Sequence, residues 1–114
     1  MRGEIWFADL SPRSGSEQMG VRPVIVLSHD SFNTKSNWKS LIVVPMSTST
    51  AQSRRSPTSI LLQAGTAGLQ KEGYALCHHV TTLDRSKLQT RVGVLTGQPL
   101  ADVEQGLKNA LDLS

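Results

Sequence analysis

Short apolar runs separated by turn-forming residues recur along the first 95 residues of the chain. Runs of about 4–8 residues that are rich in β-branched and aromatic side chains, and bounded by Pro, Gly, Ser or Asn, are typical of β-strands. The pattern predicts strands at residues 4–10, 23–28, 41–44, 59–63, 74–80 and 92–95. Single helical turns are expected within 29–37 and 84–88, and a glycine-containing turn at 65–73.

The last part of the chain follows a helical period instead. After Pro99 the apolar positions recur three or four residues apart, at Leu100, Val103, Leu107, Ala110 and Leu111. This spacing places them on one face of an α-helix. Proline is tolerated in a first helical turn, and the carboxylates of Asp102 and Glu104 complement the positive end of the helix dipole. We therefore predict a mainly β fold with an α-helix, in which a small, strongly curved sheet or barrel is capped by the C-terminal helix.

Size and composition favour one ordinary globular domain spanning residues 1–114. Hydrophobic residues make up 38% of the chain and charged residues 18%. No apolar run approaches the ~18 residues of a membrane span. The opening Met1-Arg2-Gly3-Glu4 also lacks the apolar core of a signal peptide. We expect a cytoplasmic protein that does not enter a membrane.

Net charge and the few cysteine and histidine residues exclude only some kinds of site. A formal net charge of +3 permits an anionic partner such as nucleic acid, without requiring one in so small a chain. The single cysteine, Cys77, cannot form an internal disulfide. No Cys or His cluster has zinc spacing, and the adjacent His78 and His79 would face opposite sides of a strand. We predict no metal and no other cofactor.

The densest motif lies where the first two predicted strands are joined. It reads Gly15-Ser16-Glu17-Gln18-Met19-Gly20-Val21-Arg22-Pro23-Val24-Ile25-Val26-Leu27-Ser28. Around it stand Arg2-Gly3-Glu4-Ile5-Trp6-Phe7-Ala8-Asp9-Leu10-Ser11-Pro12, then Asn33, Val43-Val44-Pro45-Met46-Ser47-Thr48-Ser49 and Thr82-Leu83-Asp84. Together these blocks resemble the MazF/PemK family of toxins from type II toxin–antitoxin systems, over nearly the whole chain.

The resemblance implies a fold, an activity and partners. It implies an SH3-like β-barrel that forms a homodimer and cleaves single-stranded messenger RNA at short sequences. It also implies a cognate antitoxin, and an acidic, partly disordered antitoxin segment would suit a chain of net charge +3. From the hydropathy pattern we expect no membrane to take part in these interactions.

RNA cleavage without a metal sets three chemical demands. The 2′-OH must lose its proton and attack the adjacent phosphorus, the phosphorane must have its negative charge stabilised, and the 5′-oxygen must gain a proton. The expected products are a 2′,3′-cyclic phosphate and a 5′-OH. A base, a permanent cation and hydroxyl or amide donors can meet these demands.

Arg22 is the strongest catalytic candidate, because its charge is permanent and its planar fork matches a phosphate. A surface or ion-paired arginine is the alternative, and the motif favours the phosphate contact. Glu17 either removes the 2′-OH proton or holds Arg22 in place. Gln18 either orients a phosphate or base edge, or stabilises a turn.

Ser47 and Thr48 are the candidate hydroxyl donors. The resemblance places Ser47 where the family usually has a catalytic threonine, which is a departure. A serine hydroxyl can still donate to a phosphate oxygen, although it rotates more freely. Thr48 can take the role if the loop shifts, and a merely solvated, hydroxyl-rich loop is the remaining alternative.

Further RNA contacts are expected from Ser16, Gln18, Arg54, Arg55, His78 and Arg85. The plasmid-borne Kid branch of the family uses a loop histidine and a later Arg-x-Asp pair. Here the matching positions are Ser16, and Leu76 with His78. Leucine is neither an acid nor a cation, so the sequence favours a mechanism built on Arg22 and a hydroxyl. A structural role for His78 remains open.

Two other functional classes remain as alternatives. One is a non-enzymatic toxin on the same barrel that binds DNA gyrase, as CcdB does. The other is a small SH3-like binding module without activity. The motif from Gly15 to Pro23 favours the nuclease.

Overall fold

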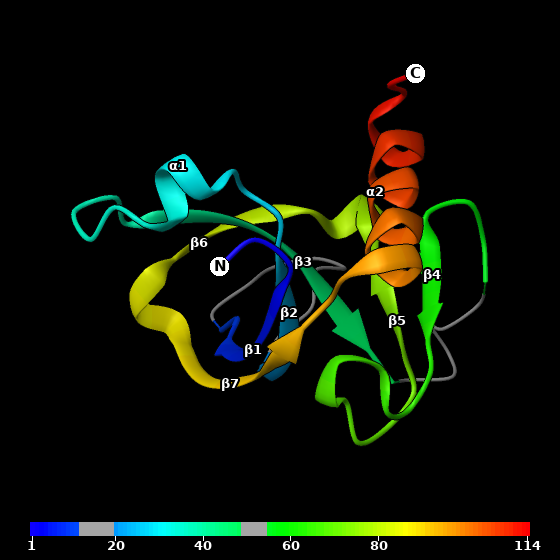
Figure 1. Cartoon of the computed structure of the whole chain (residues 1–114), viewed down its shortest axis with the longest axis horizontal. Coiled ribbons are helices and arrows are strands. Elements are labelled where there is room, and N and C mark those ends of the chain that lie inside the picture. The colour runs from blue at the N-terminus through cyan, green and yellow to red at the C-terminus, as the bar shows by residue number, and fades with distance from the viewer. Residues whose placement is uncertain (12–19, 49–54) are drawn as a thin grey trace.

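A computed structural model gives the fold, and it describes residues 1–11, 20–48 and 55–114 (Figure 1). The strands are β1 Glu4–Asp9, β2 Val21–Val26, β3 Ser40–Ser47, β4 Ser59–Leu62, β5 Gly73–Leu76, β6 Thr81–Asp84 and β7 Leu88–Val94. The helices are α1 Asp30–Asn33 and α2 Gly97–Leu111. Single 3-10 turns lie at η1 Thr66–Gly68, η2 Cys77–His79 and η3 Arg85–Lys87.

The strands form one curved antiparallel sheet. Its order is β4-β5-β3-β2-β1-β7, and β6 pairs with β3 off this path. Strand β3 is central because it pairs with β6 through residues 40–43 and with β5 through residues 46–47. The predicted mainly β architecture with a C-terminal helix is confirmed.

Strand alternation divides the buried apolar residues between the two faces of the sheet. The α2-side core contains Ile5, Ile25, Leu27, Val44, Met46, Leu62, Leu69, Ala75, Cys77, Leu95 and Val103. The β6-side core contains Ala8, Leu10, Val24, Val26, Leu41, Val43 and Leu83. Within β2, successive residues therefore enter different cores. Burial of an Ile or Leu side chain stabilises the fold by roughly 1.5–3 kcal/mol.

Helix α2 packs closely on the sheet at a glycine. A Cβ at Gly106 would lie 2.8 Å from both Cys77 Sγ and Ile60 Cγ1. Burial raises the pKa of the Cys77 thiol to about 11, so this cysteine serves as a small apolar residue in the core. Near its middle the helix is tied to the chain start by a 2.6 Å ion pair between Glu104 and Arg2. Its last turns project from the body of the molecule (Figure 1).

A buried asparagine fastens α1 to the end of β2. Asn33 is 1% exposed, its Nδ2 donates to Ser28 O at 2.5 Å, and its Oδ1 accepts from Ser28 Oγ. The Asn33 amide also donates to Asp30 Oδ1, and this bond holds the pKa of Asp30 below its ordinary value. The motif residue Asn33 thus has a structural role.

Several of the predicted element boundaries are wrong. Strand β3 passes through Pro45, which lies where β3 changes partner from β6 to β5. The strand predicted at 74–80 stops at Leu76, and residues 77–79 form η2. Strand β6 was not predicted, because three of its four residues are polar. Strand β7 begins at Leu88, and α2 begins at Gly97.

Candidate active site

The candidate site is built on the sheet face that continues beyond the β6-side core. On this face Ala8 of β1 pairs with Arg22 of β2. Val24, two residues further along β2, belongs to the β6-side core. Because side chains alternate along a strand, Arg22 leaves the sheet on the same side as Val24, just past the edge of that core. Arg22 is half-buried there.

Ser47 lies on the same face as Arg22. Val24 pairs with Pro45, and Ser47 is two residues beyond Pro45, at the last position of β3. Alternation therefore directs Ser47 and Arg22 to one side of the sheet. Ser47 is 1% exposed, so its hydroxyl is enclosed in this conformation.

Tyr74 completes this face, and sequence reasoning gave it no individual role. It pairs with Ser47 across β3 and β5 and with Leu61 across β4 and β5. It is half-buried, whereas its neighbour Ala75 is fully buried in the α2-side core. We call Arg22, Ser47 and Tyr74 the Arg22 face.

Thr48 takes the opposite side. It is exposed, and its Cγ2 would lie 3.5 Å from a Cβ at Gly73. It lines a hollow of about 520 Å³ with Phe7, Val21, Arg22, Pro23, Met46, Gly68, Leu69, Gln70, Lys71, Gly73, Thr90, Arg91 and Val92. We call this the Thr48 hollow. Arg22 belongs to both regions, because it also forms part of the hollow's wall.

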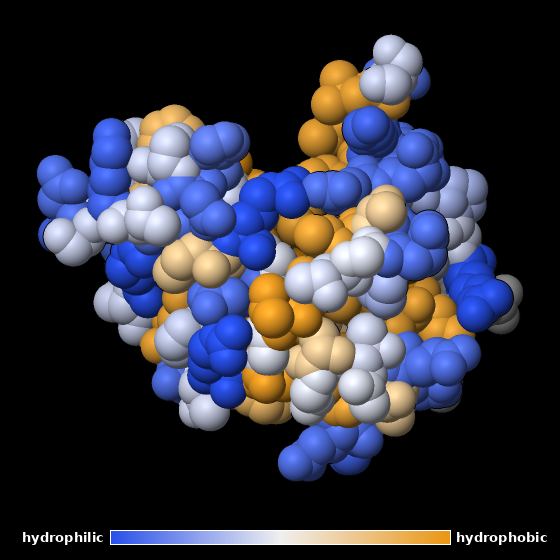
Figure 2. All heavy atoms as spheres, viewed as in Figure 1, coloured by the Kyte–Doolittle hydropathy of each residue, from blue (hydrophilic) through white to orange (hydrophobic). Residues whose placement is uncertain are grey.

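The Thr48 hollow suits an anionic ligand with apolar groups. Three of its lining residues are basic, namely Arg22, Lys71 and Arg91, and none is acidic. Phe7 and Val21 remain 40% and 55% exposed, and apolar side chains reach the surface over β1 and β7 (Figure 2). The sequence analysis gave Lys71 and Arg91 no functional role, because each lies in a segment without a recognisable motif.

Arg91 is partly neutralised by Glu4. Its Nε lies 2.9 Å from Glu4 Oε2, and Trp6 Nε1 donates to Glu4 Oε1 at 3.1 Å. Burial opposes ionisation, but these hydrogen bonds hold the pKa of Glu4 below its ordinary value. The hollow's rim is therefore anchored to β1 by a charged pair.

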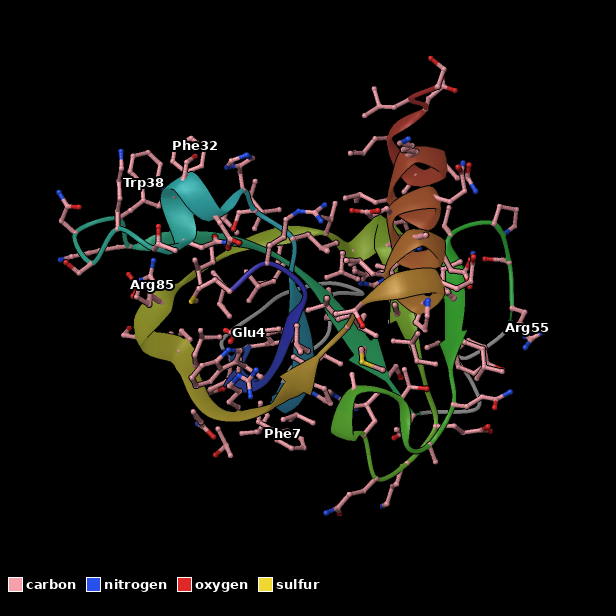
Figure 3. The ribbon with its side chains drawn as sticks, viewed as in Figure 1. Glu4, Phe7, Phe32, Trp38, Arg55 and Arg85 are labelled. Carbon is pink, nitrogen blue, oxygen red and sulfur yellow. The ribbon has the colours of Figure 1, made fainter. Side chains whose placement is uncertain are left out.

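The structure does not bring three of the predicted RNA-binding residues to Arg22. Arg85 donates to the carbonyls of Asn33 at 2.7 Å and Trp38 at 3.1 Å, so it braces the segment that follows α1. Arg55 is exposed near α2, and Figure 3 places Arg55 and Arg85 on opposite sides of the molecule. His78 is exposed on η2, with Nδ1 3.5 Å from Thr58 Oγ1.

Four predicted site residues, Ser16, Glu17, Gln18 and Arg54, lie outside the described residues. Across residues 1–11, 20–48 and 55–114, no group of His, Cys, Asp and Glu side chains could hold a metal ion. In these same parts of the chain no helix is long and apolar enough to cross a membrane.

Solved structures define the class to which this fold belongs. The Mycobacterium tuberculosis toxin MazF-mt6 matches with a TM-score of 0.77 at 21% identity, covering 97% of this chain and 98% of that one. MazF from Deinococcus radiodurans matches with a TM-score of 0.79 at 26% identity, covering 97% and 94%. A MazE–MazF structure from Deinococcus radiodurans matches with a TM-score of 0.71 at 27% identity, covering 99% of this chain and 96% of that one. The fold is that of small MazF toxins.

Sequence comparison identifies the family. A family model described as PemK-like, MazF-like toxin of type II toxin-antitoxin system matches residues 1–111. Endoribonuclease EndoA of Bacillus subtilis is 32% identical over 112 residues, covering 98% of this chain and 94% of the relative. Endoribonuclease MazF of Staphylococcus saprophyticus is 30% identical over 113 residues, covering 99% and 88%. The chain belongs to the PemK-like, MazF-like toxin family.

Proposed function

We propose that this protein is a toxin that cleaves single-stranded RNA by attack of the 2′-OH, without a metal ion. Family membership and relatives named endoribonucleases support this activity over gyrase binding or passive binding. The observation that carries the site assignment is the placement of Arg22 and Ser47 on one face at the ends of β2 and β3.

Arg22 stabilises the charge that develops at phosphorus. As the 2′-oxygen loses its proton and bonds to phosphorus, the bond to the 5′-oxygen breaks and that oxygen takes up a proton from solvent. During this step the guanidinium fork donates to the non-bridging oxygens. The Ser47 hydroxyl donates to the same phosphate. Because Ser47 is 1% exposed, RNA must displace part of the protein surface to reach it.

Glu17 is the acidic residue of the same motif. It either accepts the 2′-OH proton or holds the Arg22 guanidinium in place. A single-turnover pH–rate profile of Glu17→Gln separates the two roles. Loss of the acidic limb identifies the base, whereas a uniformly lower rate with an unchanged profile identifies a supporting contact.

The test of the function is cleavage of an end-labelled, single-stranded RNA in EDTA. We expect a 2′,3′-cyclic phosphate, or its opened form, and a 5′-OH. A 2′-deoxy substitution at the scissile nucleotide should stop the reaction, because it removes the attacking group. Cleavage of the deoxy substrate, or loss of activity in EDTA, would overturn the mechanism.

The cognate antitoxin places an acidic segment in the Thr48 hollow. The hollow's cations and apolar residues complement such a segment, and Arg22 lies in its wall. Occupying the hollow thus removes Arg22 from RNA. An antitoxin complex in which Arg22 stays accessible and cleavage continues would contradict this proposal.

We further propose that the protein works in the cytoplasm as a homodimer. Two copies would form a longer RNA-binding surface than one small barrel offers. Light scattering at micromolar concentration should give twice the monomer mass of 12.4 kDa. A stable monomer at that concentration would contradict this assembly.

A further inference from the structure

The aromatic residues of the chain are few, and most lie away from the Arg22 face. Phe32 and Trp38 pack together with ring centroids 4.9 Å apart, beside α1 (Figure 3). Phe7 lines the Thr48 hollow. Trp6 packs against the β6-side core and donates its indole N–H to Glu4. These four have evident structural surroundings, and the remaining aromatic residue is Tyr74.

Tyr74 lies one strand away from the proposed hydroxyl donor. Its Cα pairs with that of Ser47, and neighbouring strands lie about 4.8 Å apart. Leu61 pairs with Tyr74 from the other side and supplies an apolar neighbour for the ring. Within the described parts of the chain, the Tyr74 phenol oxygen makes no hydrogen bond. The ring is half-buried, so part of it remains open to a ligand.

We infer that Tyr74 is a stacking platform for the base of a nucleotide next to the scissile phosphate. The inference rests on the proposed ribonuclease activity and adds a substrate-binding residue to it. A phosphate held at Arg22 and Ser47 lies beside Tyr74, because Tyr74 pairs with Ser47 on the neighbouring strand. Aromatic rings bind bases of single-stranded nucleic acids by stacking, which tolerates different bases and needs no hydrogen bond.

The first test couples Tyr74 to one base of the substrate. Steady-state cleavage kinetics are measured on the intact RNA and on RNAs with one abasic site at each position flanking the cut. Tyr74→Leu should raise KM about tenfold or more on intact RNA, with a smaller effect on kcat. Tyr74→Phe and Tyr74→Trp should retain near-parental KM because they keep a ring.

The decisive measurement is the energetic coupling between Tyr74→Leu in the protein and the abasic site in the RNA. For the parental protein, one abasic position should weaken binding by about the same factor as Tyr74→Leu. In Tyr74→Leu that abasic site should cost little more, because the stacking partner is already gone. A residue with a merely structural role would give independent, multiplying losses. The matched control is Phe32→Leu, an exposed aromatic residue on another part of the surface, which should show no coupling.

A second measurement does not require any variant to fold. RNA carrying 5-iodouridine beside a 2′-deoxy scissile nucleotide binds the parental protein without being cut. Irradiation should cross-link it to the peptide that contains Tyr74. A cross-link elsewhere, or equal abasic penalties in parental protein and Tyr74→Leu, overturns the inference and leaves the nuclease intact. Failure of the parental protein to cut any RNA overturns both.

Discussion

The Arg22 face and the Thr48 hollow begin at the same strand ends but offer different chemistry. On the face, Arg22, Ser47 and Tyr74 combine a cation, an enclosed hydroxyl and an aromatic ring. In the hollow, exposed Thr48 stands among apolar residues and cations. The adjacent residues Ser47 and Thr48 are thus divided between two surfaces by strand alternation.

The two surfaces are suited to two different tasks, although Ser47 and Thr48 are adjacent in the sequence. The face can place a phosphate and its base for reaction, whereas the hollow can hold an acidic segment of a partner. Arg22 contributes to both regions, so under the proposed function a partner in the hollow and RNA on the face would compete for one side chain. Variants that affect one surface and not the other test the separation.

The largest expected effect is that of Arg22→Lys. Lysine keeps the charge but loses the planar fork that holds two phosphate oxygens. Loss of one such transition-state contact typically lowers the rate about a hundredfold. The measurement is single-turnover cleavage, with circular dichroism to confirm folding. Cleavage at the parental rate would remove Arg22 from the centre of the face.

Ser47 and Thr48 variants test the division directly. Ser47→Ala should lower the single-turnover rate about tenfold, a smaller loss than that of Arg22→Lys. Thr48→Ala should leave the rate within about twofold, since its side chain faces the hollow. Ser47→Thr should retain or raise activity because it introduces a stiffer hydroxyl. A larger loss for Thr48→Ala than for Ser47→Ala would reverse the assignment.

Sequence patterns predicted the general fold because apolar periodicity reports burial directly. The β-branched run in β2 and the helical spacing in α2 both survive in the structure. Strand β6 was not predicted because only Leu83 of its four residues is apolar and buried. Strand β3 was predicted to end before Pro45, although it continues to Ser47. In both cases neighbouring strands stabilise a segment whose local pattern is weak.

The candidate site was predictable where it has a motif and unpredictable where it depends on register. Resemblance drew attention to Arg22, Ser47 and Thr48, but it could not say which hydroxyl shares a face with the arginine. That answer needs the pairing of Val24 with Pro45. Tyr74 lies on the Arg22 face because β5 pairs with β3, and Lys71 lies at the Thr48 hollow. Both residues are far from the motif in sequence, so no local pattern predicts their positions.

A smaller effect is expected from Lys71→Gln. Lys71 lines the hollow and lies outside the Arg22 face, so this change should weaken antitoxin binding about threefold to tenfold and reduce its salt dependence. RNA cleavage should stay within about twofold of the parental rate. Titration calorimetry at two salt concentrations measures the first effect. Lys35→Gln, an exposed charge outside the hollow, is the matched control.

The smallest expected effect concerns Glu4, which anchors Arg91 on the hollow's rim. Although burial opposes ionisation, Arg91, Trp6 and the N-terminus hold its folded-state pKa below the ordinary value of 4.5, so the ionised carboxylate contributes stability above that pH. The contribution is lost as pH falls through the folded-state value, because Glu4 then becomes protonated. Arg91 is 49% exposed, so solvent screening limits the contribution to about 0.5 kcal/mol.

Urea unfolding of the parental protein and Glu4→Gln between pH 7 and pH 3 measures this term. The variant should be less stable by about 0.5 kcal/mol at pH 7, and the two curves should converge as the pH falls through the folded-state pKa of Glu4. Glu72→Gln alters an exposed carboxylate for which no ion pair is recorded in the described residues, and it should follow the parental curve. Cleavage by Glu4→Gln should match the parental rate, because Glu4 supports the hollow's rim and not the Arg22 face. A difference between parental protein and Glu4→Gln that does not shrink as the pH falls would mean that Glu4 stabilises the strand by packing and not by charge.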